Sequence, residues 1–251
     1  MNKIYVIIKI FFKQLVQNKI FHFVIMSGIV FGIISILLNE VSYGASEKII
    51  KSFSLGFCSI LVNFLSIYFG TSIFLGENMK HSVSLLCTKP ISRNKIILGI
   101  ILAFALCLSI SLMIIIPEFI FIFNLFGVSV TSIFYFSLLG IFFEGIILFL
   151  FTIIFRFFTN PLITVMITIS YYIFIHGAES LINLGIVSRY ILLKEGIVIF
   201  SKILPDLTYF NLKDMNIITN DAILASVCYF IISTCILTIF GMFLFNNRDL
   251  E

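Results

Sequence analysis

Residues 132–155 read SIFYFSLLGIFFEGIILFLFTIIF, and Glu144 is the only charged side chain in this stretch. A helix needs about 20 mainly apolar residues to cross the hydrocarbon core of a bilayer. The stretch therefore predicts a membrane-spanning helix, and it decides the fold class from which the rest of the chain is interpreted.

The composition extends this conclusion to all 251 residues. Of these, 61% are hydrophobic and 11% are charged, whereas soluble domains have about 45–50% and about 25% respectively. The mean hydropathy is +1.19. Because so few charges cannot cover a large core with a polar shell, the composition excludes a soluble enzyme, a nucleic-acid binder and a disordered protein. It predicts an all-α membrane protein with a single domain and no nucleic-acid partner.

A window of about 19 residues predicts six transmembrane helices. The spans are residues 21–38, 52–76, 96–123, 132–155, 161–183 and 222–245. Pro117 interrupts the third run, so it either kinks the helix or starts a loop. Asn160 and Pro161 form an N-cap followed by proline at the first helical position, which predicts a sharp start for the fifth span.

The first 19 residues predict an amphipathic helix that lies in the membrane interface. At 100° per residue, Lys3, Lys9 and Lys13 fall on one arc and most of the apolar residues on the other. An extension of the first span into the cytoplasm is the alternative. The scattered lysines and the lack of a small-residue cleavage site argue against a cleavable signal.

The distribution of Lys and Arg predicts that both termini are cytoplasmic, because basic residues gather in cytoplasmic loops. With six spans, ten of the 16 Lys and Arg lie on the side of the termini. These are Lys3, Lys9, Lys13, Lys19, Lys80, Lys89, Arg93, Lys95, Arg156 and Arg248. The opposite side has one long loop, residues 184–221, whose apolar stretches favour a short helix or a re-entrant hairpin covered by protein.

No motif for an enzyme acting alone is present. The sequence has no phosphate-binding G-x-x-x-x-G-K-[ST], no G-x-S-x-G and no H-E-x-x-H. Its five cysteines are odd in number and include no C-x-x-C, so neither a disulfide framework nor a zinc site is expected. We predict no catalytic residues, no metal site and no cofactor bound by this chain.

The loop after the second span is basic and partly apolar: residues 76–99 read GENMKHSVSLLCTKPISRNKIILG. A short helix in this loop could dock into a groove on a soluble partner, or its basic residues could meet anionic lipid or set the topology. The run resembles the corresponding loop of ABC-2 type transporter permeases. The matching residues are Glu77, Leu85, Leu86, Pro90, Ile91, Ser92 and Arg93.

The resemblance extends over nearly the whole chain, although its specific motif is this one loop. The ending LFNNRDLE, the basic N-terminal helix and LPDLTYFNL in the last outer loop are also similar to the family. His81, Ser82 and Val83 stand where the family usually has Gly-Thr and an aliphatic residue, and Ile100 where Lys is frequent. These departures put the detail of the partner contact in doubt.

The resemblance implies a permease subunit of the bacterial inner membrane. It would pair with a second permease, identical or related, and two separate ATP-binding subunits would bind ATP and magnesium and drive export. The N-terminal helix and the loop from Glu77 to Arg93 would contact those subunits. A non-transporting membrane assembly or immunity factor is the alternative, and a proton-coupled carrier using Glu144 and Glu179 is a third.

Three carboxylates fall in or at the ends of predicted spans: Glu118, Glu144 and Glu179. A carboxylate in a helix centre costs about 2.5–3.5 kcal/mol on insertion scales, so each is a candidate functional residue. His176 and Glu179 share a helix face at i, i+3. These groups either line a substrate or proton path or fix helix packing through hydrogen bonds. Gly28 and Gly32 suit close helix packing, between two permeases or within the chain.

Overall fold

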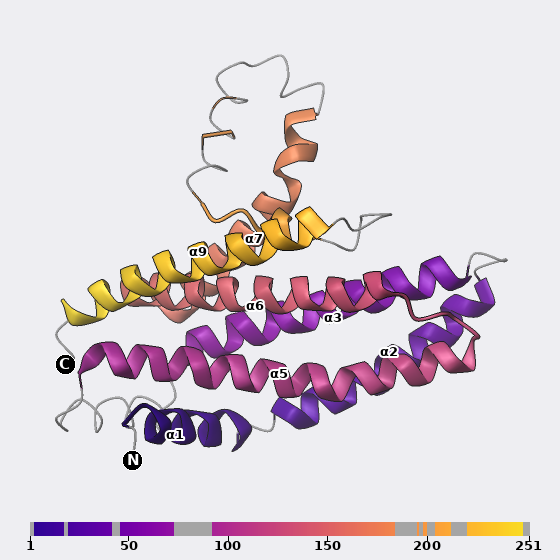
Figure 1. Ribbon diagram of the computed structural model, residues 1–251, viewed down its shortest axis with the longest axis horizontal. Helices are drawn as coiled ribbons and strands as arrows, with labels where there is room; N and C mark the ends of the chain where they lie inside the picture. The colour runs from indigo at the N-terminus through magenta and orange to yellow at the C-terminus, as the bar shows by residue number, and fades with distance from the viewer. Residues whose placement is uncertain are drawn as a thin grey trace.

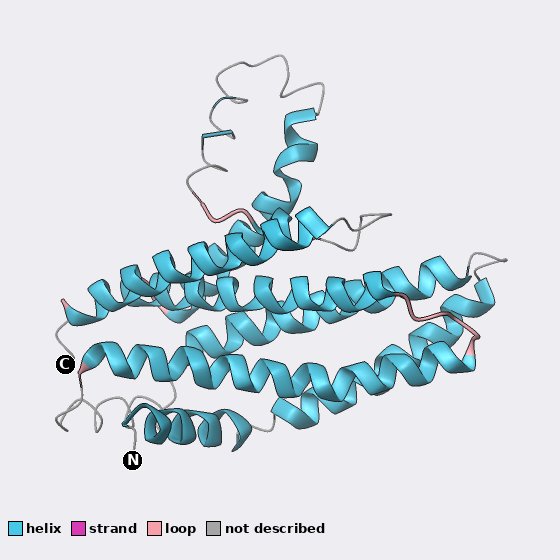
Figure 2. Cartoon of the chain, in the orientation of Figure 1, coloured by secondary structure: helices cyan, strands magenta, loops and turns pink. Residues whose placement is uncertain are grey.

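A computed structural model describes residues 3–17, 20–41, 46–72, 92–183, 195, 198–199, 204–211 and 220–247. These residues are mainly helical and include no strand (Figure 2). The long helices are α1 (Lys3–Gln17), α2 (Ile20–Val41), α3 (Ser46–Ser72), α5 (Arg93–Leu125), α6 (Ser132–Phe158), α7 (Pro161–Asn183) and α9 (Asn220–Asn246). A short 3-10 helix, η2 (Leu207–Phe210), lies between α7 and α9 in the chain.

Six of these helices are long and apolar enough to cross a membrane: α2, α3, α5, α6, α7 and α9. This confirms the predicted fold class and the six spans. The alternative in which a loop starts at Pro117 is wrong, because α5 continues through this residue to Leu125. Proline removes one backbone donor, and packing against neighbouring helices allows a membrane helix to continue through it.

The junction between α6 and α7 follows the predicted N-cap and proline pattern. α7 begins at Pro161, and the backbone N–H of Thr164 donates to the Asn160 carbonyl at 2.9 Å. Arg156, in the last turn of α6, donates from Nη1 to the Thr159 carbonyl at 2.7 Å. A basic side chain at a helix C-terminus is favourable for the helix dipole, so both sides of this turn are stabilised locally.

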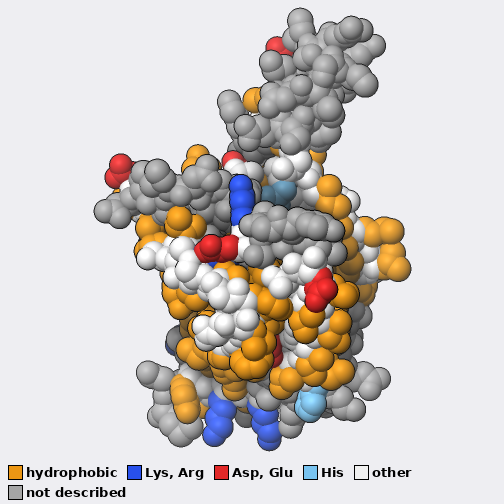
Figure 3. Space-filling view, turned by 90° about the vertical axis from the view of Figure 1, so that its right-hand side faces the viewer, with side chains coloured by type: hydrophobic (Ala, Val, Ile, Leu, Met, Phe, Trp, Pro, Cys, Tyr) orange, Lys and Arg blue, Asp and Glu red, His pale blue; other side chains and the backbone are white. Residues whose placement is uncertain are grey.

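The centre of the bundle is α6, which contacts α3, α7 and α9, whereas α1 and α2 pack on α5 (Figure 1). In the most apolar window of α6, 78% of the residues are buried, compared with 17% in α9 and 22% in α2. Hydrophobic side chains also make up much of the coloured surface in Figure 3. A bundle that is apolar inside and outside is typical of a membrane protein.

The N-terminal helix α1 has the predicted two faces. Ile7, Phe11 and Leu15 are buried, whereas Lys9 and Lys13 are exposed. Its buried face packs on the beginning of α5, where a Cβ on Gly99 would lie 2.4 Å from Ile7 Cγ2. Part of the apolar face is therefore covered by this chain itself. The position of α1 in a membrane interface stays a prediction.

Gly28 and Gly32 pack within the chain. A Cβ on Gly28 would overlap the Glu118 carboxylate of α5, and one on Gly32 would lie 3.8 Å from Ile122 Cδ1. Gly28 therefore makes room for a polar side chain where α2 crosses α5. Gly28 thus packs closely inside one chain, and a contact of this glycine pair with a second permease stays a prediction.

The segment 204–211 enters the bundle instead of lying at its end. Leu207 and Phe210 are buried, and they pack with Ile147, Leu148 and Phe151 from the middle and C-terminal half of α6. We call residues 204–211 the re-entrant segment. Its η2 turn agrees with the prediction of a short helix or re-entrant hairpin within the long outer loop.

Candidate functional site

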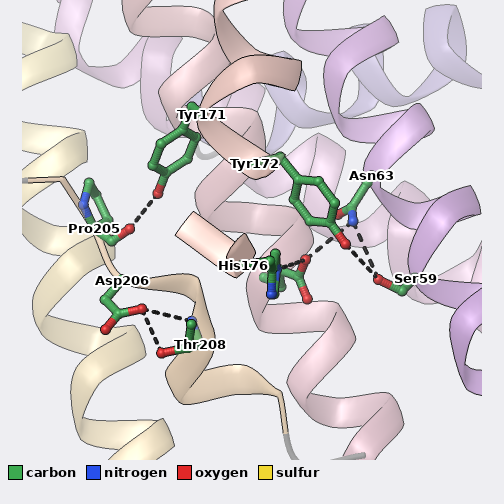
Figure 4. A network of polar contacts seen from close by, with 9 residues as sticks. Ser59, Asn63, Tyr171, Tyr172, His176, Pro205, Asp206 and Thr208 are labelled. Carbon is green, nitrogen blue, oxygen red and sulfur yellow. Dashed lines mark hydrogen bonds and ion pairs between the residues drawn. The ribbon is translucent and has the colours of Figure 1, made fainter. Parts of the chain in front are cut away.

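A polar cluster lies among the central helices of the bundle (Figure 4). Its members come from three helices: Ser59 and Asn63 from α3, Glu144 from α6, and Tyr172 and His176 from α7. We call these five residues the central cluster. Each pair on one helix is spaced i, i+4, which brings both side chains to the same face. The bundle therefore brings together two short polar stripes and one carboxylate.

Glu144 is the acceptor at the centre of this cluster. Its side chain is buried, with the residue only 3% exposed. Oε1 accepts a hydrogen bond from Asn63 Nδ2 at 3.2 Å and lies 3.4 Å from His176 Nε2. Because a buried carboxylate without partners is very costly, these two contacts explain how Glu144 is accommodated in an apolar helix.

The contacts continue from Asn63 to the other side chains. Asn63 Nδ2 lies 3.4 Å from Ser59 Oγ, which lies 3.5 Å from the Tyr172 hydroxyl. The rings of Tyr172 and His176 are 4.6 Å apart between centroids. The Asn63 Oδ1 atom is buried and has no hydrogen-bond partner by distance and angle among the described residues.

Two of the five members of the central cluster could be identified from the sequence, but the contact between them could not. Glu144 and His176 were both candidates, and the helix spacing placed His176 on the same face as Glu179. The structure pairs His176 with Glu144. The side chain of Glu179 lies outside the described residues. Ser59, Asn63 and Tyr172 were missed; the available signal was their i, i+4 spacing to another polar residue within an apolar span.

A metal site is not formed by these side chains. Among the described residues, no group of three or more His, Cys, Asp or Glu lies close enough to hold a metal ion. The two strong candidates, Glu144 and His176, are only one carboxylate and one imidazole. Both side chains can take part in hydrogen bonds.

A second polar group holds the re-entrant segment against α7 and α9. The Tyr171 hydroxyl donates to the Pro205 carbonyl, and the Asp206 backbone N–H donates to the Tyr229 hydroxyl at 2.6 Å. Asp206 Oδ1 accepts from the Thr208 backbone N–H at 2.9 Å (Figure 4). Irregular backbone at membrane depth needs such partners, and here tyrosine side chains supply them.

The third intramembrane carboxylate, Glu118, has a different environment. It lies against Gly28 on α2, and its Oε2 atom is buried without a hydrogen-bond partner among the residues that the structure describes. It is therefore part of the α2–α5 contact and does not belong to the central cluster.

The beginning of α5, which carries the predicted loop residue Arg93, meets the end of α9 at one end of the bundle. Arg93, the first residue of α5, donates from Nη1 to the carbonyls of Phe245 and Asn246 at 3.3 and 3.1 Å. Asn246 Nδ2 also donates to Asn94 Oδ1 at 2.8 Å. The start of α5 is thereby tied to the last turn of α9, where a cation stabilises the helix terminus.

Of the other predicted loop residues, the structure describes Ser92 alone. Ser92 immediately precedes α5 and is exposed. The other five lie outside the described residues: Glu77, Leu85, Leu86, Pro90 and Ile91. In the N-terminal helix, Lys9 and Lys13 are exposed, and Lys3 is the first residue of α1.

Comparisons with protein-family models and with curated proteins found no match for this chain. The features above are therefore interpreted from the sequence and the structure.

Proposed function

We propose that the chain is the membrane-spanning permease subunit of an ABC-type transporter, working as an exporter in a bacterial cytoplasmic membrane. ATP and magnesium would bind to separate subunits on the cytoplasmic side, where both termini of this chain would lie. A second permease, identical or related, would complete the assembly within the lipid. The likeness of residues 76–99 to the ABC-2 permease loop is the basis of this proposal.

One observation from the structure carries the mechanical part of the proposal. The resembling loop leads directly into Arg93, and Arg93 bonds to the final carbonyls of α9. Six residues further along α5, Gly99 packs closely against Ile7 of α1. A force on the loop or on α1 would thus pass into α5, and through Arg93 into α9.

The mechanism follows from this connection. When ATP binding closes the partner subunits, the loop and α1 would move with them, and the paired permeases would shift toward an outward-open state. Such a shift needs a partner that binds the two states with different affinity. The two connected helices, α5 and α9, are the elements through which that difference would act.

The test is to purify the tagged chain from its native membranes in mild detergent and identify the proteins that accompany it. We expect a stoichiometric ATP-binding subunit. Arg93→Ala should reduce that association, or the ATPase activity of the complex, at least several-fold. Lys95→Ala is the matched control, because Lys95 is a nearby exposed basic residue, and it should change little.

Two outcomes would contradict the proposal. One is a folded chain that carries no ATP-binding subunit, which would favour the membrane assembly or immunity factor. The other is equal behaviour of Arg93→Ala, Lys95→Ala and the unchanged chain in both association and ATPase activity. The purified chain's helix content by circular dichroism shows whether the Arg93 variant is still folded.

A further inference from the structure

The exposed side of α1 has a stripe of polar side chains. Tyr5, Lys9 and Lys13 follow one another at intervals of four residues, and all three are exposed. Residues four apart in a helix lie on one face, one above the other. We call these three residues the basic face of α1.

The basic face points away from the bundle. Ile7 and Phe11 are buried, and a Cβ on Gly99 would lie 2.4 Å from Ile7 Cγ2, so the other side of α1 is the one that packs on α5. Lys9 is two residues away from both Ile7 and Phe11, which is about 200° around the helix axis. Its side chain therefore leaves α1 on the side away from α5.

The helix α1 lies beside the bundle and not beyond its end. Gly99, which Ile7 contacts, is the seventh residue of α5, and it lies about 9 Å from the start of that helix. Figure 1 shows α1 alongside the first part of α5. Lys or Arg side chains appear at the lower edge of the molecule in Figure 3. A group that meets the basic face therefore approaches from the side, where lipid surrounds a membrane protein.

The basic face has no acidic counterpart in the nearby described helices. α1 contains no acidic residue, and the first turns of α2 and α5 contain none. Among the described residues, neither Lys9 nor Lys13 has an ion-pair partner. Lys95 at the start of α5 adds another exposed positive charge. Because like charges four residues apart repel each other, the two ammonium groups favour an anion between them.

The side chains next to the basic face are apolar. Val6 and Phe12 lie on either side of it and are partly buried. Lysine can bury its stem along apolar groups while its charged end reaches a polar layer. A basic stripe with apolar neighbours is typical of a helix at the boundary between acyl chains and headgroups. This pattern favours lipid as the partner of the basic face.

We propose that the basic face of α1 binds the headgroup phosphates of anionic phospholipids. The ammonium groups of Lys9 and Lys13 donate hydrogen bonds to phosphate oxygens, and the Tyr5 hydroxyl donates another. Because the charges of both lysines are unbalanced, a lipid with net negative charge binds more tightly than a zwitterionic lipid. The predicted orientation of the chain places this site in the cytoplasmic leaflet. The binding itself does not require ATP-driven transport.

The experiment uses a tryptophan at the site as a reporter. The chain has no tryptophan, so Tyr5→Trp supplies a single one, and its indole N–H keeps a donor in the basic face. The full chain is reconstituted into phosphatidylcholine vesicles with brominated phosphatidylglycerol or brominated phosphatidylcholine, whose bromine atoms quench tryptophan on contact. Because each lysine near an anionic surface contributes roughly a fivefold factor, phosphatidylglycerol should bind here about fivefold or more over phosphatidylcholine at low salt.

Variants of the two lysines test the source of this preference. Lys9→Gln with Lys13→Gln should bring it close to one, whereas Lys9→Arg with Lys13→Arg should retain it, because arginine also binds phosphate. Lys48→Gln with Lys51→Gln is the matched control, since it removes two positive charges at the start of α3, and it should change little. High salt should weaken the preference because it screens exposed charges.

Three outcomes would overturn the proposal. The first is an unchanged preference in Lys9→Gln with Lys13→Gln. The second is the same preference when the reporter is Leu224→Trp, at an exposed position of α9, instead of Tyr5→Trp. The third is no preference in the purified chain, even if the two Gln substitutions weaken association with an ATP-binding subunit; the basic face then contacts protein, and the proposed function stands. Conversely, a lipid preference in a chain without ATP-binding subunits contradicts the proposed function alone.

A second measurement keeps Tyr5, in case the reporter variant does not fold. The full chain is released for native mass spectrometry from micelles that contain equal amounts of phosphatidylglycerol and phosphatidylcholine. It should retain more phosphatidylglycerol, and Lys9→Gln with Lys13→Gln should lose this excess. Glycerol phosphate, which has the phosphate without acyl chains, should not displace the lipid. Equal retention of the two lipids, or displacement by glycerol phosphate, would overturn the assignment to anionic lipid.

Discussion

At the scale of single residues, burial of Glu144 is tolerated because two neighbouring helices supply polar groups to one oxygen atom. Asn63 donates to Oε1 and His176 Nε2 lies beside it. The position of Glu144 within an apolar run could be predicted from the sequence. Its partners could not, because they come from α3 and α7, and hydropathy along one segment carries no information about which face meets another helix.

Asn63→Leu should destabilise the protein by about 1–3 kcal/mol, since it removes a buried donor to a carboxylate and leaves that group less satisfied. The measurement is the free energy of unfolding in mixed micelles. Ser109→Ala is the control, because Ser109 Oγ donates its hydrogen bond to the Ala105 carbonyl of its own helix. A loss no larger for Asn63→Leu than for Ser109→Ala would contradict this account of Glu144.

At the scale of elements, the re-entrant segment depends on side chains of two transmembrane helices. Leu207 and Phe210 fill the space beside α6, while Tyr171 and Tyr229 bond to the backbone at Pro205 and Asp206. The apolar character of the long loop favoured a short helix or a re-entrant hairpin. The depth that the segment reaches depends on these tyrosines, which lie in different helices.

Tyr229→Phe should loosen the re-entrant segment, because the Asp206 backbone N–H loses its acceptor at 2.6 Å. Leaving such a group unsatisfied costs roughly 1–3 kcal/mol. Hydrogen exchange of residues 204–211 should become faster by about tenfold or more, which corresponds to about 1.4 kcal/mol.

Tyr135→Phe is the control for this experiment, since Tyr135 is an exposed tyrosine on α6. It should leave exchange in the re-entrant segment unchanged. Equal exchange in the Tyr229 and Tyr135 variants would mean that the hydroxyl of Tyr229 does not hold the segment.

At the scale of the whole molecule, an even number of spans brings the beginning of α5 and the end of α9 to the same end of the bundle, where α1 also packs (Figure 1). The turn at 126–131 between α5 and α6 lies at the opposite end. The distribution of Lys and Arg then predicts which end is cytoplasmic.

Reporter fusions test this orientation. A fluorescent protein fused to the C-terminus should be active in the cytoplasm, and alkaline phosphatase fused after Gly127 should be active outside it. Gly127 lies in the turn that follows α5. The reverse pattern, or activity of both reporters on one side, would contradict the predicted orientation of the six spans.

The sequence by itself determined the class of fold, the six spans and the start of α7 at Pro161, because length, hydropathy and capping are local properties of the chain. It also identified Glu144 and His176 as unusual residues for their surroundings. Only the tertiary structure decided that these two meet, that α5 continues through Pro117, and that Gly28 accommodates Glu118. These depend on which faces of separate helices come into contact, and in an almost uniformly apolar chain many faces are equally apolar.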